Sequence, residues 1–206
     1  MKKDDLSPEV KARRKADYPI SSFLLNRWSP RAMSGEPISQ EQLFSLFEAA
    51  RWAPSSYNNQ PWIFIYGLKG TPAWKALHEL QVPFNQGWTQ NSSALVLIVS
   101  KNNFYHNHKL ARTHSFDTGA AWMSLALEGT GQGLVVHGME GFDYEAAKKK
   151  LHIPQDYTVE AMVAIGKPAP KETLPAELQE REAPSTRRPI TDFVMEGAFK
   201  EKSSNP

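Results

Sequence analysis

The sequence predicts an α+β or mixed α/β domain with about four core strands and long terminal arms. Short apolar runs have the length of strands, and segments with the apolar spacing of helices separate them. Residues 1–20 are charged and lack a clear apolar face, and the chain after Gly166 is rich in proline and charge. With 206 residues, 40% of them hydrophobic, the chain is long enough to bury a sizeable core.

The first half of the domain is expected to alternate between helices and a strand. Ser39 and Gln42 have the spacing of a capping box, and apolar residues at helical spacing follow them until Pro54 ends the helix. Residues 55–61 are turn-like and lead into a buried strand at 62–66. Residues 72–80 predict a short helix, with proline in its first turn.

The second half adds strands at 95–99, 134–136 and 161–165. Residues 117–130 are apolar on nearly every face, which predicts a central helix that is covered on more than one side. A further helix is expected at 144–151. The segment after Gly166 still carries large apolar residues, so it either packs on something, such as a partner subunit, or is a free tail.

Composition excludes several functions. A net charge of +2 and a pI of about 8.7 do not favour nucleic acid. The absence of cysteine excludes disulfides, thiolate catalysis and cysteine-bound metals, and it suits a reducing compartment. No apolar run reaches membrane-spanning length and the N-terminus lacks an apolar signal core, which predicts a soluble cytoplasmic protein. His106, His108 and His114 are interpreted as exposed loop histidines, and no metal site is expected.

Two polar motifs suit a flat, phosphorylated ligand. Arg27, Ser29 and Arg31 alternate in RWSPR, where two guanidiniums could hold a phosphate through paired hydrogen bonds, although a basic surface loop is the alternative. Residues 54–62 (PSSYNNQPW) place hydroxyl and amide groups between a helix and a strand. Such groups could bind a polyol chain, or they could form a capped turn.

Together with other segments, these motifs resemble the nitroreductase family of flavoproteins. The resemblance covers about residues 23–195 and its most specific element is APSSYNNQPW. The other matching segments are RWSPR, Phe84-Asn85 ahead of NSSALVLIVS, GAAWMSLALEGTGQGLVVHGMEGFD, AIGKP and Arg187-Arg188-Pro189.

The resemblance implies a nitroreductase-like α+β fold, with a central mixed, mostly antiparallel sheet flanked by helices and extended terminal arms in an intertwined homodimer. It divides the chain into an N-terminal arm (1–20), a flavin-binding domain (21–169) and a C-terminal extension (170–206) that contributes to the cofactor site and the dimer. FMN is expected at the dimer interface, in a site built from both subunits.

The family's cofactor-binding positions transfer to matching residues. Arg27, Trp28 and Ser29 belong at the phosphate and ribityl end, and Arg187 reaches the phosphate from the C-terminal segment. Arg31 and Asn85 belong at the pyrimidine edge, where a fixed cation favours the charge that gathers on reduction. Glu140 and Gly141 belong at the turn that faces the flavin N5 atom. The other subunit is expected to supply the remaining positions, which are Pro54, Ser55, Ser56 and Asn58.

Two positions depart from the family pattern. Position 88 is Trp, where bacterial members carry a lysine to the pyrimidine edge, and this Trp is interpreted either as a neighbour of that edge or as a core or channel-lining aromatic. Position 185 is Ser, where those members place a second phosphate-binding lysine. Residues 100–116, which help form the family's substrate channel, carry no assignable motif.

The resemblance implies that hydride passes from NAD(P)H to flavin N5 and on to a small acceptor such as a nitroaromatic or a quinone. No catalytic side chain is expected, because the cofactor supplies the chemistry. The sequence has no dinucleotide-binding fingerprint, so donor and acceptor should share one face in a ping-pong mechanism. A flavin-binding or storage protein, reductive dehalogenation and oxygen-dependent flavin chemistry remain alternatives.

Overall fold

The computed structural model describes residues 5–201, and the chain forms two compact units. The sheet unit comprises Ser29–Glu182, and the arm unit comprises the described residues on either side of it, 5–28 and 183–201. The predicted terminal segments include residues 1–4 and 202–206, which lie outside the described residues. The expected boundaries at residues 20 and 169 stay a prediction.

A four-stranded sheet forms the centre of the sheet unit, in the order β1-β2-β4-β3. Every neighbouring pair is antiparallel, which confirms the predicted α+β class. Residues 94–99 and 162–165 of the two central strands are buried and wholly apolar, as expected where both faces of a strand are covered. The strands are β1 (Trp62–Leu68), β2 (Ala94–Lys101), β3 (Val135–Met139) and β4 (Tyr157–Gly166).

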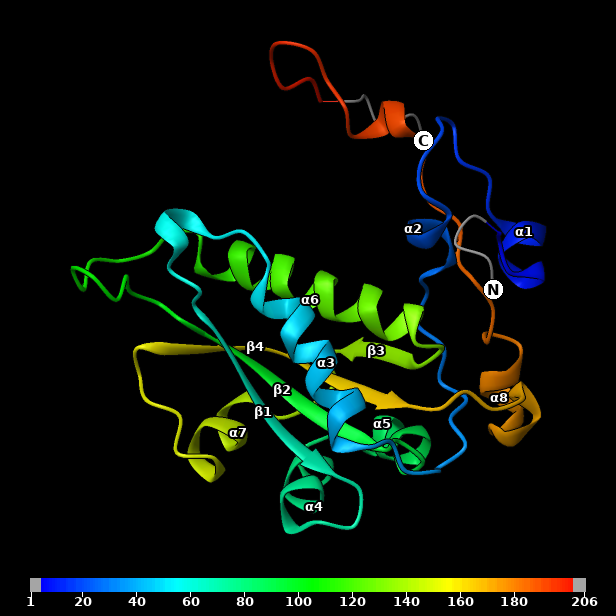
Figure 1. Cartoon of the computed structure of the whole chain (residues 1–206), viewed down its shortest axis with the longest axis horizontal. Coiled ribbons are helices and arrows are strands. Elements are labelled where there is room, and N and C mark those ends of the chain that lie inside the picture. Colours follow the sequence, from blue (N-terminus) through cyan, green and yellow to red (C-terminus); the bar gives the residue numbers. More distant parts are fainter. Residues whose placement is uncertain (1–4, 202–206) are drawn as a thin grey trace. The chain divides into compact units, whose positions relative to one another are not determined.

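Helices cover both faces of this sheet, as Figure 1 shows. On one face, α3 (Gln40–Arg51) and α6 (His114–Gly131) bury residues such as Leu46 and Leu125. On the other face, four shorter helices contribute to a second core around Leu97 and Met162. These helices are α4 (Pro72–Glu79), α5 (Pro83–Thr89), α7 (Tyr144–Lys150) and α8 (Ala176–Gln179); the short turns η1 (Ser56–Asn58) and η2 (Lys171–Thr173) complete the unit.

Local sequence explains where α3 begins and ends. The Ser39 side chain accepts a hydrogen bond from the Gln42 N–H at 3.0 Å, and the Gln42 side chain accepts one from the Ser39 N–H, which together form the predicted capping box. Two residues after the helix cap at Trp52, Pro54 prevents its continuation. The predicted strands and the helices at α4, α6 and α7 are likewise present.

Three features differ from the sequence interpretation. The strand β1 is an edge strand, so most of its residues are only partly buried. The helix α5 was not predicted, because Pro, Asn and Gly in PFNQGWT weaken the helical pattern. Leu174 and Leu178 are buried in the sheet unit's core, although the sequence after Gly166 shows no obvious core.

The arm unit contains two short helices and a turn, α1 (Pro8–Arg13), α2 (Ser22–Asn26) and η3 (Ile190–Asp192). Asn26 connects the first two, because its side-chain oxygen accepts from the Ser7 N–H and its nitrogen donates to the Asp5 carbonyl, both at 2.9 Å. No helix among residues 5–201 is long and apolar enough to cross a membrane.

Candidate functional site

Asn85 and Gly141, two of the predicted site residues, are in direct contact within the sheet unit. Asn85 Nδ2 donates to the Gly141 carbonyl at 3.0 Å, and the Val82 N–H donates to the same carbonyl at 3.0 Å. A side chain at position 141 would collide with Asn85, because an added Cβ would lie 2.6 Å from Asn85 Nδ2. The glycine therefore allows the loop after β3 to approach the start of α5 closely.

Trp88 fixes the orientation of the Asn85 side chain. Its Nε1–H donates to Asn85 Oδ1 at 3.1 Å, and because an indole nitrogen only donates, the amide oxygen must face Trp88. The Trp88 side chain is only 2% exposed and belongs to the core. Of the two sequence interpretations, the core aromatic is confirmed. The Trp88 side chain is also a direct neighbour of Asn85.

Arg31 also lies near Trp88, with its guanidinium carbon 6.0 Å from the centre of a Trp88 ring. Its position is fixed through the backbone, because Glu182 Oε1 accepts from the N–H groups of Arg31 and Ala32 at 2.6 and 2.8 Å. Burial lowers the pKa of Arg31, Glu182 raises it and Arg181 lowers it again. Arg31 Nε and Glu182 Oε2 are buried without a hydrogen-bond partner, so the site retains polar atoms that a ligand could use.

The predicted polyol-binding loop has a strained backbone. Tyr57, Asn58 and Gln60 have φ angles of 52°, 51° and 48°, in the left-handed region that side chains disfavour. Such strain persists only where the surroundings enforce it, and it clusters at functional sites. Here the Ser56 N–H donates to the buried carboxylate of Asp117 at 3.1 Å, and the Gln60 N–H donates to Ser55 Oγ at 3.0 Å.

This loop and Arg31 lie at opposite ends of the sheet. The loop runs directly into Trp62, which pairs with Ser100 at one end of β2. Arg31 precedes Met33, which bridges to Pro168 just beyond the other end of β4. A strand of seven residues such as β1 is about 20 Å long. One sheet unit therefore does not bring Pro54, Ser55, Ser56 and Asn58 to Arg31.

The remaining predicted residues occupy other positions. Ser29, half-buried, is the first residue of the sheet unit, and Glu140 is exposed at the end of β3. Arg27, Trp28 and Arg187 belong to the arm unit, where Arg187 Nη1 donates to Ser185 Oγ at 2.8 Å. Burial lowers the pKa of Arg27, and the nearby Arg187 lowers it further.

Sequence reasoning missed one basic residue of the arm unit and misplaced one histidine. Burial is the main cause that lowers the pKa of Arg14, and the charges of Arg187 and Arg27 lower it further, so the three residues lie close together.

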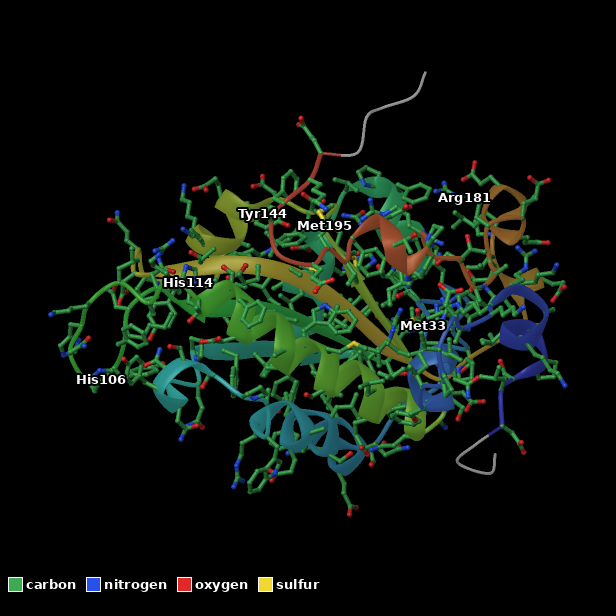
Figure 2. The ribbon with its side chains drawn as sticks, turned by 90° about the horizontal axis from the view of Figure 1, so that it is seen from above. Met33, His106, His114, Tyr144, Arg181 and Met195 are labelled. Carbon is green, nitrogen blue, oxygen red and sulfur yellow. The ribbon has the colours of Figure 1, made fainter. Side chains whose placement is uncertain are left out.

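His114 is not an exposed loop histidine, because its side chain is 18% exposed and forms a hydrogen bond with Ser100 Oγ at 2.7 Å. His106 lies further out on the loop, as Figure 2 shows. Within residues 5–201, no three His, Asp or Glu side chains are grouped as metal ligands would be.

Comparison with known proteins assigns this chain and its fold to a family. The sequence profile described as "Nitroreductase family" matches residues 24–67 and 67–167. The chain belongs to the nitroreductase family. This confirms the resemblance and the nitroreductase-like fold, and it makes the chain a member of an oxidoreductase family.

Several known proteins are similar to this chain over most of its length. A crystal structure described as an oxidoreductase containing FMN is 43% identical, covers 92% of this chain and 97% of its own, and has a TM-score of 0.88. MhqN of Bacillus subtilis (strain 168), provisionally named an NAD(P)H nitroreductase, is 24% identical over 79% of this chain and 90% of its own. A Desulfovibrio desulfuricans structure in complex with FMN, 21% identical, covers 90% of this chain and 100% of its own; its TM-score of 0.69 supports the fold.

Proposed function

We propose that this protein is an FMN-dependent oxidoreductase that passes hydride from NAD(P)H, through flavin N5, to a small acceptor such as a nitroaromatic or a quinone. The observation that supports this proposal most is a chain of contacts. Arg31 lies near Trp88, Trp88 donates to Asn85, and Asn85 donates to Gly141. The family pattern assigns Arg31, Asn85 and Gly141 to the flavin ring. The FMN content of the 43% identical structure and the NAD(P)H in the name of MhqN support the cofactors.

The residues of the sheet unit suit the ring of FMN. Buried Arg31 Nε lacks a partner, and Gly141 lies directly against the Asn85 amide. A flat ligand with polar edges would supply the missing acceptor for Arg31. The family pattern assigns Arg27, Trp28, Ser29 and Arg187 to the phosphate and ribityl end of FMN.

When bound, FMN would supply the hydride chemistry, so the side chains act by binding and electrostatics. Arg31 would stabilise negative charge at the pyrimidine edge, and the stacking of its guanidinium over Trp88 would keep it there. Asn85 would donate its remaining N–H, because its oxygen faces Trp88 and its first N–H faces the Gly141 carbonyl. Glu140 and Gly141 would border the N5 position.

A homodimer completes this proposal. The loop residues Pro54, Ser55, Ser56 and Asn58 lie about a strand's length from Arg31 in one subunit, so they would serve the partner's site. The helix α6 also leaves an apolar face uncovered, since Phe116 and Met123 are 80% and 37% exposed. Two helices of that kind from two subunits could cover one another.

A mixed dimer tests the two-subunit site. Subunits carrying Arg31→Ala are combined with subunits carrying Asn58→Ala, and tight FMN sites are counted by fluorescence titration. If each site takes Arg31 from one subunit and Asn58 from the other, the mixed dimer keeps one intact site in two, whereas either homodimer variant has none. A mixed dimer without any site of parental affinity would contradict the proposal, as would a parent protein that is monomeric by light scattering and still binds FMN tightly.

A further inference from the structure

Arg14 is held in place by three backbone carbonyls of the arm unit. Its Nη1 donates to the carbonyls of Leu25 and Arg27 at 2.6 and 2.8 Å, and its Nε donates to the carbonyl of Ser185 at 2.9 Å. It therefore connects the segment that carries Arg27 to the segment that carries Arg187. Arg14 and Ser185 are 171 residues apart in the sequence.

The Arg14 guanidinium is left with one polar atom that nothing satisfies. Its Nη2 is buried and has no hydrogen-bond partner. Burial lowers the pKa of Arg14, and the charges of Arg187 and Arg27 lower it further. Three guanidiniums within electrostatic range of one another repel, and a buried N–H without an acceptor is costly, so an anion at this position would relieve both effects.

We propose that Arg14 is a third phosphate-binding cation, beside Arg27 and Arg187, and that it serves in place of the lysine that bacterial relatives carry at position 185. This inference rests on the proposed FMN function. Position 185 is Ser here, and Arg14 Nε contacts the carbonyl of that same residue. The charge missing from the C-terminal segment is thus supplied from the N-terminal arm, and Nη2 is the atom available to the phosphate.

Comparison of FMN with riboflavin isolates the phosphate contribution, because the two ligands differ only in that group. In Arg14→Ala, FMN affinity should fall by a factor of about 10 to 150, as expected for a charge-assisted hydrogen bond, and riboflavin affinity should stay within about twofold of the parent. Arg13→Ala is the matched control, since Arg13 is the adjacent, exposed arginine, and it should leave both affinities unchanged. Both are measured by flavin fluorescence titration.

A purely structural role gives a different result. If Arg14 only ties the two segments together, Arg14→Ala displaces Arg27 and Arg187, and adding Ser185→Lys recovers no FMN affinity, which overturns the inference; unchanged FMN affinity in Arg14→Ala overturns it too. Arg14→Gln carries the same test if Arg14→Ala does not fold, because its amide can still donate to one carbonyl. A parent protein that binds neither flavin would instead refute the proposed function.

A second variant tests the exchange of positions. Adding Ser185→Lys to Arg14→Ala should recover at least tenfold in FMN affinity without changing riboflavin affinity, because the ammonium restores only the charge at the phosphate. Failure to recover FMN affinity would contradict the claim that positions 14 and 185 serve the same anion.

Discussion

Gly141→Ala would displace the Asn85 side chain from its hydrogen bonds. The added Cβ would lie 2.6 Å from Asn85 Nδ2 and 3.1 Å from Val82 Cγ2, both inside van der Waals contact. Asn85 cannot simply rotate away, because Trp88 Nε1 holds its oxygen at 3.1 Å and the residue is 8% exposed. The carbonyl of residue 141 would lose the Asn85 donor, and the loop after β3 would have to shift.

Two contributions set the size of the effect. Overpacking a well-packed site costs about 1–3 kcal/mol, and a lost buried hydrogen bond costs about 0.5–1.5 kcal/mol. We therefore expect Gly141→Ala to lower the free energy of unfolding of the apoprotein by about 2–4 kcal/mol. FMN affinity should fall at least about tenfold as well, since Asn85 no longer presents its N–H to the ligand.

Urea denaturation and FMN fluorescence titration measure these two quantities. Gly87→Ala is the matched control, because a Cβ there meets nothing within 4 Å and alanine favours the helix α5. This control should be as stable as the parent or more so. Parental stability and parental FMN affinity in Gly141→Ala would refute the close packing of Gly141 on Asn85 as the basis of the site.

Three further predictions address the phosphate, Trp88 and the kinetics. Arg187→Ala should weaken FMN binding by about 1.5–3 kcal/mol while leaving the flavin spectrum nearly unchanged, and an equal loss in Arg188→Ala only would assign the phosphate to Arg188 instead. Trp88→Lys would raise the flavin reduction potential if residue 88 faced the pyrimidine edge. Because Trp88 is only 2% exposed, we instead expect the buried ammonium to lower the stability of the protein in urea denaturation. A stable variant with a raised reduction potential would contradict the core position of Trp88. Initial rates against NAD(P)H at several fixed acceptor concentrations should give parallel double-reciprocal lines, whereas intersecting lines would exclude the ping-pong mechanism.

Local signals made much of the fold predictable. The Ser39–Gln42 capping box and Pro54 determine where α3 begins and ends, and long apolar runs determine β2 and β4. The edge position of β1 was not predictable, because a short apolar run does not specify how many neighbours a strand has. The helix α5 depends on tertiary contacts, namely the burial of Asn85, Trp88 and Thr89, which outweigh its weak helical propensity.

The candidate site was predictable only where the family pattern reaches. It identified Asn85 and Gly141, which are in contact, and Arg31, which lies close by. Arg14 lies in an arm that reads as solvated charge, and its role depends on carbonyls that are distant in sequence. Sequence reasoning had no means of finding Glu182 either, because a carboxylate that accepts two backbone N–H groups has no local pattern.

Anaerobic reduction of the FMN-loaded protein by NADH or NADPH tests the central claim most directly. The purified protein, incubated with FMN and freed of excess by gel filtration, should be yellow. Addition of either nicotinamide should rapidly bleach the visible flavin band, and a quinone or nitroaromatic should restore it. A protein that retains FMN but is not bleached would be a flavin-binding or storage protein, and a protein that retains no FMN would contradict the account as a whole.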